Sequence, residues 1–158
     1  MLLAVFSDTH GRAEPMIRAV ERYAPDLVLH LGDGARDAAA LAAALPSQAL
    51  RCVRGNCDPD SSIPEKLFFT LECVPVFMTH GHLYSVKYTW DPLRNAAGFL
   101  GARLVLFGHT HQALCREEEG VLFLNPGSAG IGAEKSFALL ELEAGVIRRR
   151  ILPLPDAE

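Results

Sequence analysis

Short apolar runs alternate with helical patterns through the first half of the chain. The runs at 2–6, 26–31 and 49–53 are typical of buried strands. The spacing of apolar residues over 15–23 and the Ala/Leu-rich stretch 37–45 predict two helices between them. Strands separated by single helices and tight loops indicate a parallel sheet with right-handed crossovers.

The pattern changes in the second half. The polar, turn-rich stretch 58–64 predicts a mobile flap. Ala144 and Gly145 fit a two-residue hairpin turn. Parallel units followed by antiparallel strands predict an α/β fold in which two β-sheets pack face to face with helices outside. The expected elements are strands at 67–71, 74–79, 103–107, 113–116, 121–124, 137–142 and 146–152, and a helix at 92–100.

Composition narrows the class of protein. A chain of 158 residues, 49% hydrophobic and 22% charged, suits one soluble domain over residues 1–158. The net charge is −4 and the basic run 148–150 lies on a predicted strand, so we expect no extended nucleic acid as a partner. No apolar run suits a membrane span or a signal segment, and the four cysteines form no CxxC pair. These features predict a cytoplasmic protein with reduced thiols and no membrane partner.

The candidate chemistry lies where apolar runs stop. All six histidines lie within four residues of such a run, and Asp8, Asp33 and Asn56 also follow strands. Ligands of open α/β sheets bind beyond the carboxyl ends of strands. Seven groups are too many for one tetrahedral ion but suit two divalent ions that share a carboxylate. Asp33, between Gly32 and Gly34, is the expected bridge. The seven candidate metal ligands are Asp8, His10, Asp33, Asn56, His80, His109 and His111.

Charge indicates what such a centre binds. Two carboxylates balanced by two divalent ions leave a net positive charge, which attracts a phosphate ester. The expected reaction is in-line attack on phosphorus by a metal-bridging hydroxide. Mixed nitrogen and oxygen ligands favour Mn²⁺, Fe, Ni²⁺ or Zn²⁺ over Ca²⁺, and we expect Mn²⁺ to support activity.

Five short motifs in register resemble the calcineurin-like metallophosphoesterases, most closely their small single-domain phosphodiesterase branch. The resemblance covers about positions 1–130 and implies a four-layer αββα sandwich. It implies that Asp8, His10, Asp33 and His111 hold one ion, and that Asp33, Asn56, His80 and His109 hold the other. The motifs are Asp8-x-His10, Gly32-Asp33, Gly55-Asn56, His80 and Gly108-His109-x-His111, with Asn125-Pro126-Gly127-Ser128 as a further block.

Cys57 departs from the family pattern, because most of the superfamily has a His there that assists the leaving oxygen. A thiol is a weak hydrogen-bond donor, and loss of a positioned acid typically costs about 10²–10⁴-fold in rate. The sequence therefore predicts hydrolysis of activated aryl phosphodiesters and slower action on unactivated phosphates. Asp33, Asn56 and Cys57 are the candidate catalytic residues. His82 is a candidate for substrate contact or for a hydrogen bond to a loop.

Simpler roles are expected for other residues near the motifs. His30 should be a core or supporting residue, and Asp58 and Asp60 should form turns on the flap surface. The block 125–128 is first of all a turn. Three cysteines are expected to be small buried side chains, namely Cys52, Cys73 and Cys115.

The family resemblance also leaves an alternative function. The superfamily includes a retromer-coat scaffold subunit, so a metal-binding interaction module with little or no catalysis is the rival. The complete set of seven ligands favours an enzyme acting on a small phosphate ester. An exposed antiparallel edge and the family both allow a homodimer. A nuclease is disfavoured by the acidic composition.

Overall fold

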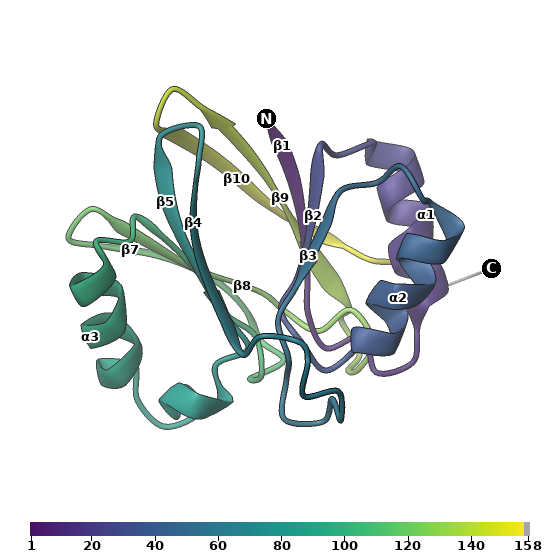
Figure 1. The fold of residues 1–158 in the computed structure, drawn as a ribbon, viewed down its shortest axis with the longest axis horizontal. Coiled ribbons are helices and arrows are strands. Elements are labelled where there is room, and N and C mark those ends of the chain that lie inside the picture. The colour runs from purple at the N-terminus through teal and green to yellow at the C-terminus, as the bar shows by residue number, and fades with distance from the viewer. Residues whose placement is uncertain (157–158) are drawn as a thin grey trace.

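The computed structural model describes residues 1–156 (Figure 1). Within these residues the strands form two five-stranded sheets, with strand orders β10-β9-β1-β2-β3 and β4-β5-β6-β8-β7. No helix in this part of the chain has the length and apolar character to cross a membrane. The elements in chain order are β1 (Leu2–Phe6), α1 (Ala13–Tyr23), β2 (Leu27–His30), α2 (Ala35–Ala44), β3 (Leu50–Cys52), β4 (Lys66–Leu71), β5 (Val74–Thr79), the 3₁₀ turn η1 (His82–Tyr84), α3 (Asp91–Leu100), β6 (Leu104–Leu106), β7 (Ala113–Glu118), β8 (Val121–Pro126), β9 (Ser136–Glu143) and β10 (Val146–Pro153).

The first sheet joins the two halves of the chain. Strands β1, β2 and β3 are parallel, as the alternation of strands and helices predicts. The last hairpin, β9–β10, then pairs antiparallel with β1. Ala144 and Gly145 both have positive φ, 48° and 82°, which is the backbone that a two-residue hairpin turn requires. The hairpin turn predicted at these two residues is therefore confirmed.

The second sheet combines both pairing modes. The predicted hairpin of β4 and β5 is antiparallel, while β5, β6 and β8 run parallel. Strand β7 closes the other edge antiparallel to β8. Strands β5 and β6 therefore end at the same edge of this sheet.

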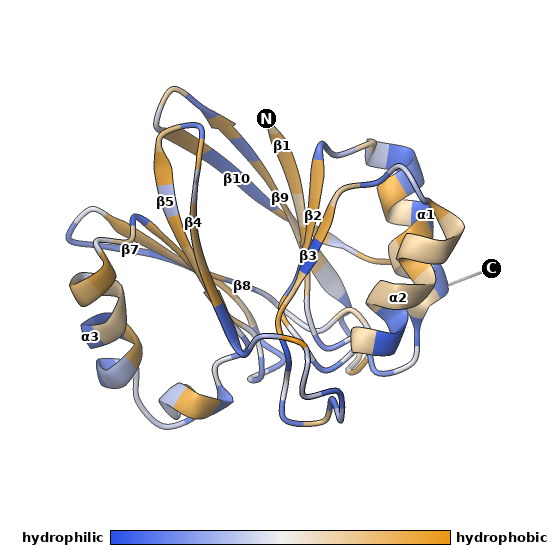
Figure 2. Ribbon diagram, in the orientation of Figure 1, coloured by the Kyte–Doolittle hydropathy of each residue, from blue (hydrophilic) through white to orange (hydrophobic). Residues whose placement is uncertain are grey.

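The apolar side chains divide by strand face into three clusters. Leu3 and Val5 pack between the sheets with Met78 and Leu106, whereas Phe6 faces outward to α1 and α2. A third cluster lies under α3. Because alternate strand residues point to opposite faces, one sheet can bury both sides. Figures 1 and 2 show the resulting layers, with α1 and α2 on the outer face of the first sheet and α3 on the outer face of the second. The predicted four-layer αββα sandwich is confirmed.

Two cysteine predictions are wrong. Cys73 and Cys115 are exposed, and Cys52 is half-buried. Cys73 lies in the turn between β4 and β5 with φ 65°, and Cys115 lies on the edge strand β7. A turn and a sheet edge give these residues no layer to pack against, which composition alone does not reveal.

Candidate metal centre

The strand ends bring the candidate ligands together at one edge of the two sheets, the lower edge in Figure 1. Asp8 and His10 follow β1, Asp33 follows β2 and Asn56 follows β3, and the other three follow β5 and β6. Six of the seven predicted metal ligands form two compact triads, and the ligand atoms within each triad lie within 4.8 Å of one another. The triads are Asp8, His10 and His111, and Asp33, His80 and His109.

The backbone at these residues is unusual. Five of the six triad residues have left-handed φ, between 46° and 68°, although none is glycine. Such a backbone is costly for most side chains and concentrates at functional sites. Hydrogen bonds between the loops hold it, because the amide of Asp8 donates to Gly32 O at 2.9 Å and the amide of His10 donates to Asp33 O at 3.1 Å. The fold therefore sustains strain where the candidate ligands lie.

The two carboxylate oxygens of Asp8 have different surroundings. Oδ2 accepts hydrogen bonds from Ser7 Oγ at 2.5 Å and from the amide of His109 at 3.1 Å. Oδ1 lies 3.2 Å from His111 Nε2 and 3.7 Å from His10 Nε2. One oxygen thus fixes the side chain to the protein, and the other faces imidazole nitrogens, as a metal-ligating carboxylate would.

Asp33 repeats this division. Its Oδ1 accepts a hydrogen bond from the amide of Cys57 at 2.8 Å. Its Oδ2 lies 3.3 Å from His80 Nε2 and 3.9 Å from His10 Nε2. Because His80 and His10 belong to different triads, this oxygen lies between the two sets of ligands. The arrangement suits the bridging role predicted for Asp33.

The imidazoles leave nitrogen atoms available for a metal. His80 donates from Nδ1 to Leu31 O at 2.8 Å, so that its Nε2 points to the carboxylates. Within residues 1–156, the buried Nε2 atoms of His10 and His80 have no hydrogen-bond partner. Buried polar atoms without partners are costly, and divalent ions would satisfy both nitrogens. The residues present therefore fit two divalent ions.

The pKa directions describe the same pocket. Burial lowers the pKa of His80, but the nearby carboxylates of Asp33 and Asp8 outweigh it and raise the value. Burial acts to raise the pKa of Asp33, yet His80 and the Cys57 amide hold that pKa well below its usual range. Burial and the neighbouring His80 lower the pKa of His109 to about 4. Two ionised carboxylates at 1% and 3% side-chain exposure favour a positive charge between them.

Asn56 lies beside the triads on the loop after β3. The preceding residue, Gly55, packs so closely on Gly32 that an added Cβ at Gly32 would lie 2.6 Å from the Gly55 nitrogen. Asn56 Nδ2 donates to Cys57 Sγ at 3.4 Å, its one side-chain hydrogen bond in the described chain. Its role as a metal ligand stays a prediction. The exposed thiol of Cys57 has a raised pKa, through desolvation and the charge of Asp33.

The other two histidines, His30 and His82, have different surroundings. His30 is fully buried; it accepts a hydrogen bond from the Gly32 amide at Nδ1, 3.1 Å, and its Nε2 lies 3.0 Å from Thr9 Oγ1. This confirms its interpretation as a core or supporting residue. His82 lies with its ring centroid 5.4 Å from that of His80. Its buried Nδ1 makes no hydrogen bond in the described residues, so a bond from that nitrogen to a loop is not seen.

Asp58 has a larger role than the turn and flap surface expected from the sequence. Its Oδ2 accepts hydrogen bonds from the backbone amides of Asp33 at 2.7 Å and Gly55 at 2.9 Å. Its Oδ1 accepts hydrogen bonds from the backbone amides of Gly34 and Ala35, both at 3.0 Å. Gly34, the N-cap of α2, has no side chain to cap the helix. Asp58 therefore caps α2 and joins the Asp33 and Asn56 loops. Its position directly after the Gly55-Asn56 motif and Cys57 was the only signal in the sequence.

The block 125–128 also supports the centre rather than only forming a turn. Asn125 Nδ2 donates to Gly108 O at 3.1 Å, directly before His109. Ser128 Oγ donates to Asp8 O at 2.8 Å. These bonds attach the end of β8 to the loops after β6 and β1. The motif could be recognised in the sequence, but its two hydrogen-bond acceptors, Gly108 O and Asp8 O, could not, because they are distant along the chain.

Comparisons with known proteins agree with this geometry. The family model described as the calcineurin-like phosphoesterase superfamily domain matches residues 1–145. The probable metallophosphoesterase YsnB of Bacillus subtilis is 33% identical over 148 residues, covering 90% of this chain and 85% of that protein. The crystal structure of a predicted phosphoesterase from Streptococcus pneumoniae has a TM-score of 0.83 and 30% identity, covering 96% of this chain and 88% of that one.

Two further relatives have names of different kinds. The phosphodiesterase YfcE of Escherichia coli is 29% identical over 171 residues, covering 89% of this chain and 88% of that protein. The vacuolar protein sorting-associated protein 29 of Schizosaccharomyces pombe is 31% identical over 120 residues, covering 69% of this chain and 64% of that protein. The similarity therefore extends both to named enzymes and to a protein named for sorting.

Proposed function

The chain belongs to the calcineurin-like phosphoesterase superfamily, and from this premise we propose that it is a dinuclear metal-dependent phosphodiesterase. The observation that carries the proposal is the pair of triads joined by Asp33 Oδ2. Two divalent ions, when bound, would lower the pKa of a shared water and offset the charge that develops on the phosphoryl oxygens. Mn²⁺ is the ion we propose for activity, with Fe, Ni²⁺ and Zn²⁺ also suited to these ligands.

The chain's own residues define the rest of the reaction. Asp8 and Asp33 each keep one oxygen on protein donors, which fixes the direction of the other. Cys57 lies beside Asp33, and in the family pattern this is the position from which a His assists the leaving oxygen. Since a thiol donates a hydrogen bond weakly, we propose that the enzyme prefers esters whose alcohol leaves without a proton, such as aryl diesters.

A second candidate function is a metal-binding scaffold, and the similarity to the sorting-associated protein 29 favours it. Five of the six triad residues have strained backbone, which weighs toward catalysis because an assembly surface does not need that strain. A small phosphate ester is the partner we propose. A homodimer and a cytoplasmic location stay predictions from the sequence.

Release of p-nitrophenol from bis(p-nitrophenyl) phosphate tests the proposal. We expect turnover with Mn²⁺, none with excess chelator, and none in Asp33→Ala, which removes the oxygen between the triads. Glu119→Ala, at an exposed turn, is the matched control and should keep full activity. Equal turnover with and without chelator would contradict a metal-dependent enzyme, and metal binding without turnover of any ester would favour the scaffold.

A further inference from the structure

Two hollows adjoin the first triad, and each is lined by one of its histidines. The smaller, about 450 Å³, is lined by His10, Asp33, Arg36 and Cys57, among others. The larger, about 1030 Å³, begins at His111. The ring centroids of His10 and His111 are only 5.5 Å apart, so both hollows open beside one centre. A phosphodiester has two ester groups that extend from phosphorus in different directions, and a site with two hollows suits such a molecule.

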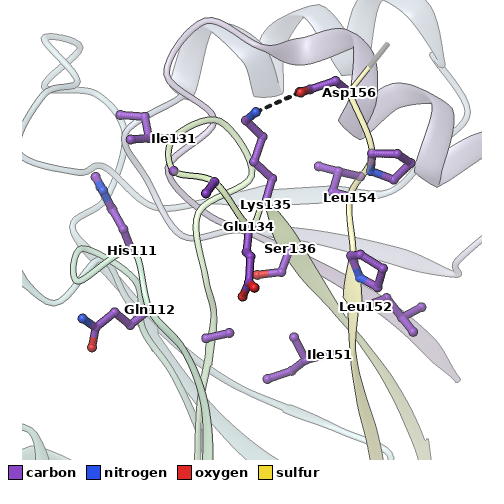
Figure 3. A pocket seen from close by; sticks show the side chains of 15 residues that line it. His111, Gln112, Ile131, Glu134, Lys135, Ser136, Ile151, Leu152, Leu154 and Asp156 are labelled. Carbon is purple, nitrogen blue, oxygen red and sulfur yellow. Dashed lines mark hydrogen bonds and ion pairs between the residues drawn. The ribbon is translucent and has the colours of Figure 1, made fainter. Parts of the chain in front are cut away.

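The larger hollow has a mainly apolar lining with two carboxylates, Glu134 and Asp156. Ile131, Ile151 and Leu152 line it, and Figure 3 shows Glu134 directed between Gln112 and Ile151. Within the described residues Glu134 makes no ion pair and no side-chain hydrogen bond. The lining therefore offers apolar contact and an acceptor for hydroxyl groups, and it disfavours a second phosphate.

The only lysine in this lining does not offset the charge of Glu134. Lys135 Nζ donates to Asp156 Oδ1 at 2.9 Å, and Figure 3 shows it directed away from Glu134. Asp156 also pairs with Arg12, two residues after His10. This ion cluster fixes the far wall of the larger hollow to the loop that holds a candidate ligand.

The wall that includes Ile131 is attached to the same loop. The amide of Gly130 donates to Asp8 O at 3.1 Å, and the amide of Ala129 donates to Ser7 O at 2.9 Å. The amide of Ile131 donates to Ser128 Oγ at 2.8 Å. The position of the larger hollow relative to Asp8 is therefore set by direct backbone contacts, and a molecule held there would have a defined distance to the metal centre.

We propose that the larger hollow binds the retained alcohol of a phosphodiester substrate, and that this alcohol is an uncharged, partly apolar group with free hydroxyls, of the nucleoside type. The inference rests on the proposed phosphodiesterase function. Cys57 lines the smaller hollow, so the leaving alcohol departs on that side and the retained alcohol lies on the side of His111. The Glu134 carboxylate accepts a hydrogen bond from a hydroxyl of the retained group.

The test compares two p-nitrophenyl phosphodiesters that differ only in the retained alcohol, thymidine or methanol. Ala133→Trp places a large ring on the exposed loop that lines the larger hollow. The ring should fill the hollow and displace the thymidine group from its apolar contacts, which raises KM for the thymidine ester at least about tenfold. The KM for the methyl ester should stay within about twofold. Ala43→Trp, at an exposed position of α2 outside both hollows, is the matched control and should change neither.

Glu134→Gln tests the carboxylate separately. Loss of one charge-assisted hydrogen bond at an exposed position should raise KM for the thymidine ester about three- to tenfold, with no change for the methyl ester. Glu119→Gln should be silent. Equal effects of Ala133→Trp on both esters, or none on either, would overturn the proposal.

A binding measurement gives a readout that does not depend on turnover. Thymidine alone, titrated into the protein without added metal, should shift the methyl NMR signals of Ile131 and Ile151 but not that of Ile17 on α1. No shift at Ile131 and Ile151 would overturn the proposed subsite. If neither ester is hydrolysed with Mn²⁺, the proposed function fails, and the titration alone then decides whether the larger hollow binds a nucleoside.

Discussion

Asp58 offers the sharpest test of how the candidate site is held together. Four backbone amides donate to its two oxygens, two to each. Asp58→Ala leaves all four without this acceptor. Asp58→Asn keeps the shape of the side chain, but its amide nitrogen must face two of the four donors. We therefore expect Asp58→Asn to be nearly as destabilising as Asp58→Ala, although it looks conservative.

The size of the Asp58 effect follows from its surroundings. A hydrogen bond to a charged group contributes about 1.5–3 kcal/mol, and loss of a helix N-cap costs about 0.5–2 kcal/mol. Because Asp58 is partly exposed, water replaces part of each lost bond. We expect Asp58→Ala to lower the free energy of unfolding by about 3 kcal/mol. Affinity for Mn²⁺ should fall about 10–100-fold, since the Asp33 and Asn56 loops lose their common anchor.

The assay is urea unfolding followed by circular dichroism in excess chelator, with Mn²⁺ affinity measured separately by calorimetry. Asp60→Ala is the matched control, because within residues 1–156 the Asp60 side chain accepts hydrogen bonds only from Ser62 in the same loop. It should leave both the free energy of unfolding and Mn²⁺ affinity unchanged. If the free energy of unfolding of Asp58→Ala differs from that of wild type by less than about 0.5 kcal/mol, the effect is no larger than that of an ordinary surface substitution. That result would refute the role of Asp58 in holding the two loops together.

Two further predictions concern Cys57 and His30. Cys57→His should raise kcat for a diester with a poor leaving group by up to about 10²-fold, with Cys115→His as the control, and no gain would refute a missing acid. Burial lowers the pKa of His30 to about 4, so between that value and the ordinary histidine value of 6.5 the unfolded chain binds a proton that the folded chain excludes. In chelator, the free energy of unfolding should therefore fall by about 3 kcal/mol from pH 7 to pH 4, less so in His30→Gln; equal slopes in both proteins would contradict this.

Much of the fold could be predicted because its signals are local. Apolar runs, Pro46 after the second helix, and the pair Ala144-Gly145 each fix an element within a few residues. Local pattern does not say which strands become neighbours. The placement of the last hairpin beside β1 depends on long-range pairing of residues more than 130 positions apart, such as Leu3 with Leu140.

The candidate ligands could be found because strand ends gather at one edge of a sheet. Asp8, His10 and Asp33 each lie within four residues after an apolar run, so their convergence follows from parallel topology. The residues that hold them could not be found in this way. Asp58 acts through backbone amides, and any carboxylate in a turn has the same local pattern. The left-handed backbone at the ligands likewise arises from contacts between distant loops.

The central claim is that the two triads hold a pair of divalent ions bridged by Asp33. Anomalous scattering from crystals soaked in Mn²⁺ tests it most directly. We predict two peaks about 3.5–4 Å apart, one at Asp8, His10 and His111 and the other at Asp33, His80 and His109. A crystal in which these six side chains surround no anomalous peak at saturating Mn²⁺ would contradict the claim.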